Sequence, residues 1–117
     1  MKKFLTTYTG QKLAYSMTEG AGPTVIFLGG FKSDMEGSKA IFLEKWAKKR
    51  NRSFLRFDYS GHGQSSGDFL SLGIGDWLKD AMQIIELIKN NDLILVGSSM
   101  GGWVSLLLSR ELGKRLK

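Results

Sequence analysis

Residues 93–102 read LILVGSSMGG, and their pattern sets the frame for the whole chain. The apolar run at 93–96 is typical of a strand that is buried on both faces. The residues behind it fit the pattern G-x-S-x-G, in which Gly97 and Gly101 flank Ser99, and a helix-like stretch follows. A strand, a sharp turn and a helix in this order hold a serine hydroxyl above the end of a sheet. The segment therefore predicts a nucleophile elbow at Ser99.

The small residues around the serine explain this assignment. On such a turn the positions two before and two after the nucleophile must be tiny, because strand and helix nearly touch there. Gly97 and Gly101 meet this need for Ser99, whereas the same spacing fails for Ser98. The turn also directs the Met100 amide, at a helix N-terminus, toward the place where an oxyanion would form. The alternative interpretation is an ordinary glycine-rich turn that grips a phosphate.

Around this elbow, short apolar runs alternate with helical spacing. The expected strands cover Lys3–Tyr8, Lys12–Thr18, Val25–Leu28, Phe54–Phe57 and Leu93–Val96, and the expected helices cover Glu36–Arg50, a stretch beginning at Asp76, and Met100–Leu112, with Gly113 as its C-cap. Two strands followed by three strand–helix units indicate an α/β fold. We expect a single domain over residues 1–117. Its mostly parallel sheet should have about five strands, with helices on both faces.

The helices and turns carry finer expectations about which residues face inward and which cap. The first helix should bury Ala40, Leu43 and Ala47, with Phe42 and Trp46 beside them. The second helix should bury Trp77, Leu78, Ala81, Ile85 and Ile88. The third helix should bury Met100, Val104, Leu107, Leu108 and Leu112. The expected N-caps are Ser33 or Asp34 for the first helix and Asp76 for the second. Pro23 is expected in a turn over residues 19–23.

Composition excludes several classes of protein. With 42% hydrophobic and 24% charged residues in a chain of 117, the sequence is globular and neither disordered nor collagen-like. Cysteine is absent, which excludes disulfides, a cysteine nucleophile and thiolate metal ligands. With one histidine besides, a structural zinc site is not expected, and no other metal or cofactor is predicted. The loop after residue 58 matches neither the dinucleotide fingerprint nor a P-loop.

The formal charge of +6 raises nucleic acid or an acidic surface as a binding partner. The cations are scattered along the chain, however, and only Lys114, Arg115 and Lys117 cluster. A solvated basic surface is the favoured interpretation, and salt-dependent anion binding is the weaker alternative.

No apolar run approaches the length of about 18 residues that is needed to span a bilayer. Met1-Lys2-Lys3 resembles the start of a signal peptide, but Thr6, Thr7 and Thr9 interrupt the apolar stretch that should follow. We therefore expect a cytoplasmic protein without a membrane span.

Two further segments belong to the same edge of the sheet as the elbow. Gly29-Gly30-Phe31 closes the preceding buried strand, so the backbone amide of Phe31 is a candidate second oxyanion donor. Residues 58–67, DYSGHGQSSG, follow the next strand, and their glycines permit backbone conformations that other residues resist.

Together these segments resemble the amino-terminal half of the α/β-hydrolase superfamily. The similarity covers nearly the whole chain and is closest, at Gly30-Phe31, residues 57–61 and residues 97–103, to the branch of palmitoyl-protein thioesterases and acyl-glucuronide esterases with their bacterial relatives. The resemblance implies hydrolysis of acyl esters or thioesters, with Ser99 as nucleophile and the Met100 and Phe31 amides as oxyanion hole. Gly29 departs from the family, in which Pro or His often stands before the glycine; backbone donors should tolerate this change.

The acid and the base of the triad are missing from the pattern. In this fold the order is Ser, then Asp or Glu, then His, and the chain stops one helix after Ser99. His62 lies in an earlier loop and is the alternative base, because convergent triads need not follow chain order. We expect Asp58 to bond local backbone amides. Asp76 should cap a helix, and Asp80 should be a solvated charge.

These observations predict a nucleophile-bearing half of a serine hydrolase that is inactive or weakly active alone. Without later strands, residues 93–96 should form an exposed sheet edge, and part of Leu106-Leu107-Leu108 should be uncovered. The alternative is a non-catalytic interaction module that pairs through this edge with a complementary chain or with itself. An acyl pocket could be lined by three aromatic residues, Phe31, Tyr59 and Trp103. The alternative interpretation is that they belong to the hydrophobic core.

Overall fold

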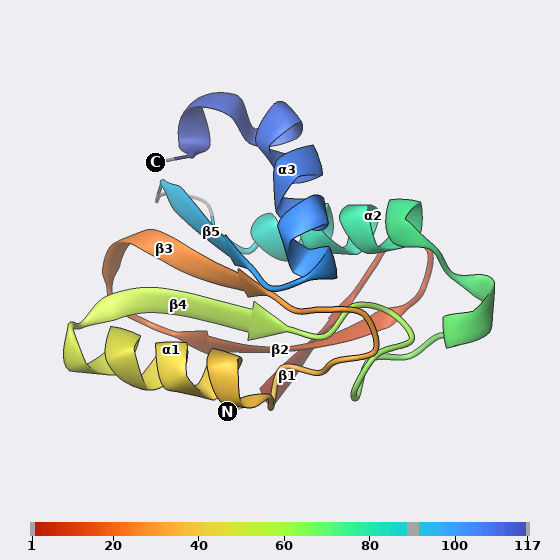
Figure 1. Ribbon diagram of the computed structural model, residues 1–117, viewed down its shortest axis with the longest axis horizontal. Coiled ribbons are helices and arrows are strands. Elements are labelled where there is room, and N and C mark those ends of the chain that lie inside the picture. The colour runs from red at the N-terminus through yellow and green to blue at the C-terminus, as the bar shows by residue number, and fades with distance from the viewer. Residues whose placement is uncertain (1, 89–91, 117) are drawn as a thin grey trace.

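The computed structural model describes residues 2–88 and 92–116, which form one layered α/β unit (Figure 1). Its strands are β1 (Lys2–Thr6), β2 (Lys12–Thr18), β3 (Ala21–Leu28), β4 (Arg52–Phe57) and β5 (Leu93–Gly97). Its helices are α1 (Ser38–Lys49), α2 (Ile74–Ile85) and α3 (Met100–Leu112), with 3-10 turns at Phe69–Ser71 and Gly113–Arg115. The predicted strand–helix alternation is confirmed.

The five strands lie in the order β1-β2-β4-β3-β5. The hairpin strands pair antiparallel with each other, and β2 also pairs antiparallel with β4. The other three strands form a parallel set with β3 at its centre. The carboxyl ends of β3, β4 and β5 therefore meet at one edge, where parallel sheets bind their ligands.

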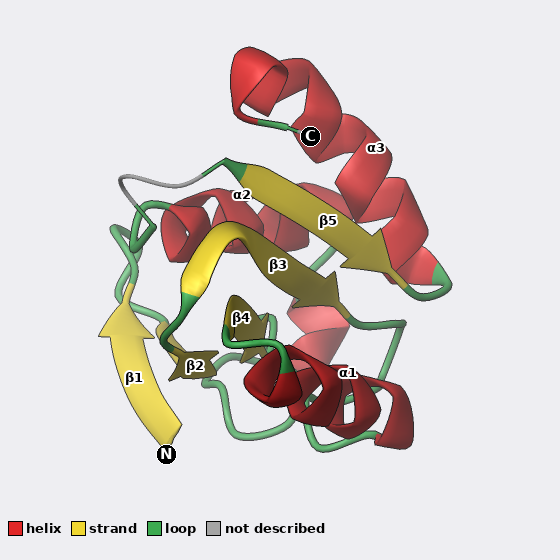
Figure 2. Ribbon diagram, turned by 90° about the vertical axis from the view of Figure 1, so that its left-hand side faces the viewer, coloured by secondary structure: helices red, strands yellow, loops and turns green. Residues whose placement is uncertain are grey.

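Helices cover both faces of the sheet, as the sequence predicts (Figure 2). On one face α1 packs against a cluster that includes Val25 and Phe27 of β3. On the other, α2 and α3 pack against a larger cluster that includes Ile26 and Leu28 of the same strand. Successive residues of β3 thus point to opposite helix layers, which explains the unbroken apolar run at 25–28.

Two N-cap predictions are wrong. The N-cap of α1 is Gly37, because Asp34 turns its carboxylate to the Glu36 amide, 2.9 Å away, and leaves the helix uncapped by a side chain. Helix α2 begins at Ile74, before Asp76, whose carboxylate reaches back to accept from the Gly73 amide at 2.9 Å. That is how a third helical residue satisfies the first free donor of a helix.

Two further element ends are shifted from their predicted positions, and one is as predicted. Residues 21–23, predicted as a turn, belong to β3, which carries a register shift between Ala21 and Val25. Ile88 is buried as predicted but lies beyond the end of α2. Gly113 caps α3 with φ 53°, which confirms the predicted C-cap.

Strand β5 lies at one edge of the described sheet, as predicted. After α3 the chain returns to that strand, where Leu116 forms an isolated parallel bridge with Leu93. On the outer surface of α3, Leu106 is 70% exposed while Leu108 is buried, so the expected uncovered part of this leucine run is present.

Candidate active site

The elbow at Ser99 is a strained turn between β5 and α3. Ser99 has φ 57° and ψ −117° and directly precedes the first residue of α3. A non-glycine residue with positive φ is uncommon and persists only where surrounding contacts hold it. Here the Ser98 amide donates to the Leu28 carbonyl oxygen at 3.0 Å, and the Gly102 amide donates to the Ser99 carbonyl oxygen at 2.9 Å. Both sides of the turn are therefore fixed.

The two elbow glycines stand where backbones nearly touch. A Cβ added to Gly101 would overlap the carbonyl oxygen of Leu28 and lie 2.8 Å from that of Gly29. A Cβ added to Gly97 would lie 2.5 Å from the Gly101 carbonyl carbon. The backbones at Gly97 and Gly101 thus leave no room for a side chain, as the expected strand–helix contact requires.

The two candidate oxyanion donors come from different elements that converge on Ser99. Met100 is the first residue of α3, so its amide is one of the helix amides that have no intrahelical partner. Phe31 follows Gly30, and a Cβ added to Gly30 would lie 3.3 Å from Cβ of Ser99. The end of β3 therefore runs directly beside the serine.

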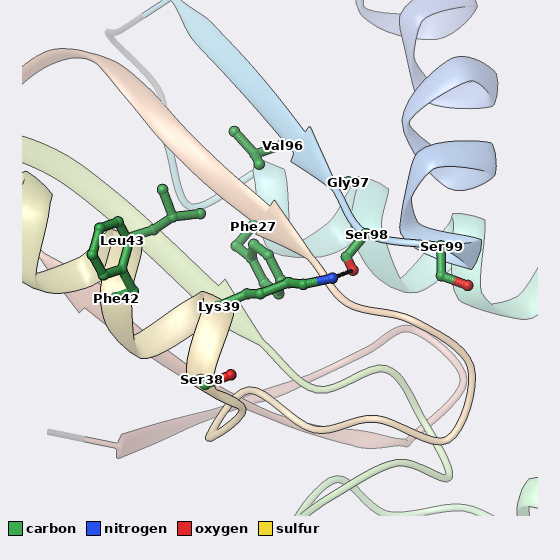
Figure 3. Close-up of a pocket in the computed structure, with 9 residues that line it drawn as sticks. All are labelled: Phe27, Ser38, Lys39, Phe42, Leu43, Val96, Gly97, Ser98 and Ser99. Atoms are coloured by element: carbon green, nitrogen blue, oxygen red, sulfur yellow. Dashed lines mark hydrogen bonds between the residues drawn. The ribbon is translucent and has the colours of Figure 1, made fainter.

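A pocket of about 760 Å³ opens between α1 and β5 (Figure 3). Its lining includes the apolar side chains of Phe27, Phe42, Leu43 and Val96. At its mouth the Lys39 ammonium donates to the Ser98 hydroxyl at 3.1 Å, whereas the Ser99 hydroxyl points away from Lys39. Gly97, Ser98 and Ser99 complete the lining at this end, so the pocket adjoins the elbow.

Lys39 is a site neighbour that sequence reasoning missed. It stands in the first turn of α1, which contains no acidic residue. A cation is unfavourable beside the positive end of a helix dipole, and this conflict is the signal that the sequence offered.

His62 is not at a pocket rim, as a base would be, but in the core. It is 3% exposed and its ring packs against Tyr59, Phe69 and Trp77. Its Nδ1 lies 3.1 Å from the Ser60 carbonyl oxygen, which can only accept, so Nδ1 carries the hydrogen. Its Nε2 is buried and has no hydrogen-bond partner among the described residues. In the part of the chain that the structure describes, residues 2–88 and 92–116, no hydrogen bond joins His62 to Ser99.

Asp58 organises loops, as predicted, although one of its partners is distant in sequence. Its carboxylate accepts from the Met35 amide at 2.7 Å and from the Gln64 amide at 3.0 Å. Burial raises the pKa of Asp58, while these two hydrogen bonds act in the opposite direction.

The prediction for Asp80 is wrong, because this carboxylate is buried rather than solvated. It is 6% exposed and accepts from both the amide and the hydroxyl of Ser60, at 2.8 and 2.6 Å. Burial raises the pKa of Asp80, opposed by the bonds from Ser60. The helix position of Asp80 gave no sign of this, since its partner lies in the loop after β4.

The three aromatic residues considered for an acyl pocket separate into two groups. Tyr59 is buried, whereas Phe31 and Trp103 are 55% and 57% exposed. Within the described ranges, no group of three or more His, Cys, Asp or Glu side chains is placed to hold a metal ion. None of the described helices is long and apolar enough to cross a membrane.

The layered sheet, the strained serine and the close-packed glycines define the class of α/β hydrolases. Residues 21–117 match the family Hydrolase_4, described as Serine aminopeptidase, S33, and the chain belongs to this family.

Named relatives agree with this assignment. The mitochondrial palmitoyl-protein thioesterase ABHD10 of Rattus norvegicus is 44% identical over 94 residues, which are 80% of this chain and 32% of that protein. The structure of alpha/beta hydrolase domain-containing protein 10 from mouse superposes with a TM-score of 0.95 at 36% identity, covering 99% of this chain and 46% of that one.

The fold extends to more distant structures. Est1E from Butyrivibrio proteoclasticus, solved with ferulic acid, superposes with a TM-score of 0.84 at 22% identity over 94% of this chain and 49% of that one. The chain thus spans about half the length of these solved structures and about a third of the rat relative.

Proposed function

We propose that Ser99 is the nucleophile of a serine hydrolase that acts on acyl esters or thioesters. The observation that carries the proposal is the backbone of Ser99, a non-glycine residue held at φ 57° at the start of α3. Strain of this kind is maintained at functional sites. Support for the substrate class comes from the relatives named palmitoyl-protein thioesterases.

In this reaction the Ser99 hydroxyl oxygen attacks the acyl carbonyl carbon and gives its proton to a base. The Met100 and Phe31 amides donate to the oxyanion that forms. The alcohol or thiol then leaves with a proton, and water hydrolyses the acyl-enzyme. We propose that the acid and the base belong to parts of the fold that follow the nucleophile in the relatives.

The test is labelling of the 117-residue chain with a fluorophosphonate probe, with and without added imidazole as a base. In labelling, the serine oxygen displaces fluoride from phosphorus and its proton passes to the base. We expect slow labelling that imidazole accelerates. Labelling should be lost in Ser99→Ala and retained in the matched variant Ser98→Ala.

Labelling that persists unchanged in Ser99→Ala would refute the proposal. A rate that falls in His62→Ala to the same level as in Ser99→Ala would instead assign the base to His62. The buried position of His62 leads us to expect no such loss.

The position of β5 at the sheet edge favours a second candidate, a module that pairs with a complementary chain or with itself. It predicts that the purified chain associates in size-exclusion chromatography with light scattering. A stable monomer would count against it. The predicted cytoplasmic localisation stays a proposal; the rat relative is named as mitochondrial.

A further inference from the structure

The loop that joins β3 to α1, residues 29–37, brings Gly30, the residue before Phe31, beside Ser99. Its tip is a turn in which the Ser33 amide donates to the Gly30 carbonyl oxygen at 3.1 Å. Lys32, in that turn, has φ 62°, a conformation that lysine rarely adopts. Such a turn keeps its shape only if other groups hold it.

The rear of this loop is held through the backbone of Met35. The Asp58 carboxylate accepts from the Met35 amide at 2.7 Å, and the Arg56 guanidinium donates to the Met35 carbonyl oxygen at 3.0 Å. Arg56 is itself fixed by Glu44, whose carboxylate accepts at 2.9 Å from Nε. All of these groups are buried, so the rear anchor is rigid.

The front of the loop is held by one hydroxyl and by ring contacts. Tyr59, which is 2% exposed, donates its hydroxyl hydrogen to the Gly29 carbonyl oxygen at 3.2 Å. Gly29 is two residues before Phe31 in the chain. The Phe31 ring adds a side-chain contact, with its centroid 5.0 Å from that of Phe69 and 5.9 Å from that of Trp77.

We propose that Tyr59 is a positioning residue for the oxyanion hole. Its hydroxyl fixes the Gly29 carbonyl, and through it the turn that presents the Phe31 amide to Ser99. This inference rests on the proposed function, because it assigns the amide a role in that reaction. Asp58 and Arg56 hold only the rear of the loop. Without the Tyr59 hydroxyl, the front keeps only the ring contacts of Phe31 and the Lys32 ammonium over the Phe69 ring, so it becomes looser.

The test compares Tyr59→Phe with Tyr8→Phe. Both changes remove one phenol hydroxyl, but that of Tyr8 donates to the Glu86 carboxylate at 3.2 Å on the exposed surface. In fluorophosphonate labelling with imidazole, Tyr59→Phe should lower the maximal inactivation rate about fivefold, the value of one hydrogen bond. The half-saturating probe concentration should stay unchanged, since the oxyanion forms only during the reaction. Tyr8→Phe should behave as the unmodified chain.

A second measurement does not depend on reactivity. Amide hydrogen exchange of Ser33, followed by NMR, should be about fivefold faster in Tyr59→Phe, because the turn opens more often. Exchange of Met35 should not change, because its anchor on Asp58 remains.

The two measurements separate the possible failures. If the unmodified chain is not labelled, the proposed function fails, and Ser33 exchange alone decides whether Tyr59 fixes the loop. Unchanged Ser33 exchange in Tyr59→Phe overturns the inference. Faster exchange with an unchanged inactivation rate also overturns it, because the loop would then move without consequence for the reaction.

Discussion

Replacement of Gly101 by alanine should show how much the close packing at the elbow contributes to stability, apart from the effect of helix propensity. The new Cβ would overlap the Leu28 carbonyl oxygen and lie 2.5 Å from the Leu28 carbonyl carbon. Both atoms belong to the backbone of β3, which cannot rotate away, so α3 must move off the sheet. A substitution that overpacks a core in this way costs about 1–3 kcal/mol, and we expect the upper part of that range here.

The neighbouring glycine supplies the matched control. A Cβ added to Gly102 meets nothing within 4 Å, although this residue lies in the same turn of α3. Gly102→Ala should therefore stabilise the protein by about 0.5 kcal/mol, because alanine loses less backbone entropy in a helix. The two adjacent substitutions should differ by about 3 kcal/mol in the free energy of unfolding, with opposite signs.

Urea unfolding followed by tryptophan fluorescence measures this difference, with the buried Trp77 as the main reporter. With a slope of about 1.5 kcal/mol per molar, the unfolding midpoints of the two variants should differ by about 2 M. Fluorophosphonate labelling should be slower in Gly101→Ala and unchanged in Gly102→Ala. Equal midpoints for Gly101→Ala and Gly102→Ala would refute the close contact between the elbow and β3.

Three further predictions concern buried polar side chains. Arg56→Met should destabilise the fold by about 2–4 kcal/mol, because it leaves the buried Glu44 carboxylate with only the exposed Lys48 ammonium, 3.8 Å away, as an ionic partner. Lys2→Met, which breaks a more exposed pair with Glu36, should cost less than about 1 kcal/mol; urea midpoints measure both. His62→Phe should change stability by less than about 1 kcal/mol, because it removes an unpaired buried nitrogen along with one hydrogen bond; a larger loss would show that Nε2 has a partner. Because the folded state binds the Asp80 proton more tightly than the unfolded chain, stability from this group should rise as pH falls from its raised folded pKa toward the ordinary value of 3.8. Asp80→Asn should remove that increment from a series of urea midpoints against pH, and identical pH profiles would contradict the raised pKa.

Much of the fold could be predicted from the sequence because its signals are local. The apolar run at 25–28 and the helical stripe of Ala40, Leu43 and Ala47 report burial directly, and burial in turn fixes which face each element presents. The predicted cap of α1 was wrong because Asp34 satisfies an amide one turn too early. The spacing of residue types along the sequence does not show which of several nearby amides a polar side chain will bind.

The part of the candidate site that escaped prediction consists of contacts between segments far apart in the chain. Asp80 looks like a solvated helix residue until the loop after β4 places Ser60 against it. Lys39 looks like a solvated charge until the packing of α1 places its ammonium 3.1 Å from the Ser98 hydroxyl. In both cases the side chain is ordinary and its partner is supplied by topology, which a pattern of residue types does not encode.

Strand β4 shows how the fold links these separate contacts to the elbow. It lies beside β3 in the sheet, so residues at its carboxyl end face the loop that leaves β3. From there Arg56 and Asp58 hold Met35, and Tyr59 holds Gly29. From sequence alone, the motif after β4 indicates only a glycine-rich loop. Its geometry indicates that the residues at the start of this motif support the loop beside Ser99, although none of them reaches the serine itself. Because β3 and β4 are parallel neighbours, residues at the end of β4 can fix the backbone of the loop that follows β3. Removal of the Tyr59 hydroxyl therefore tests this support of the site directly.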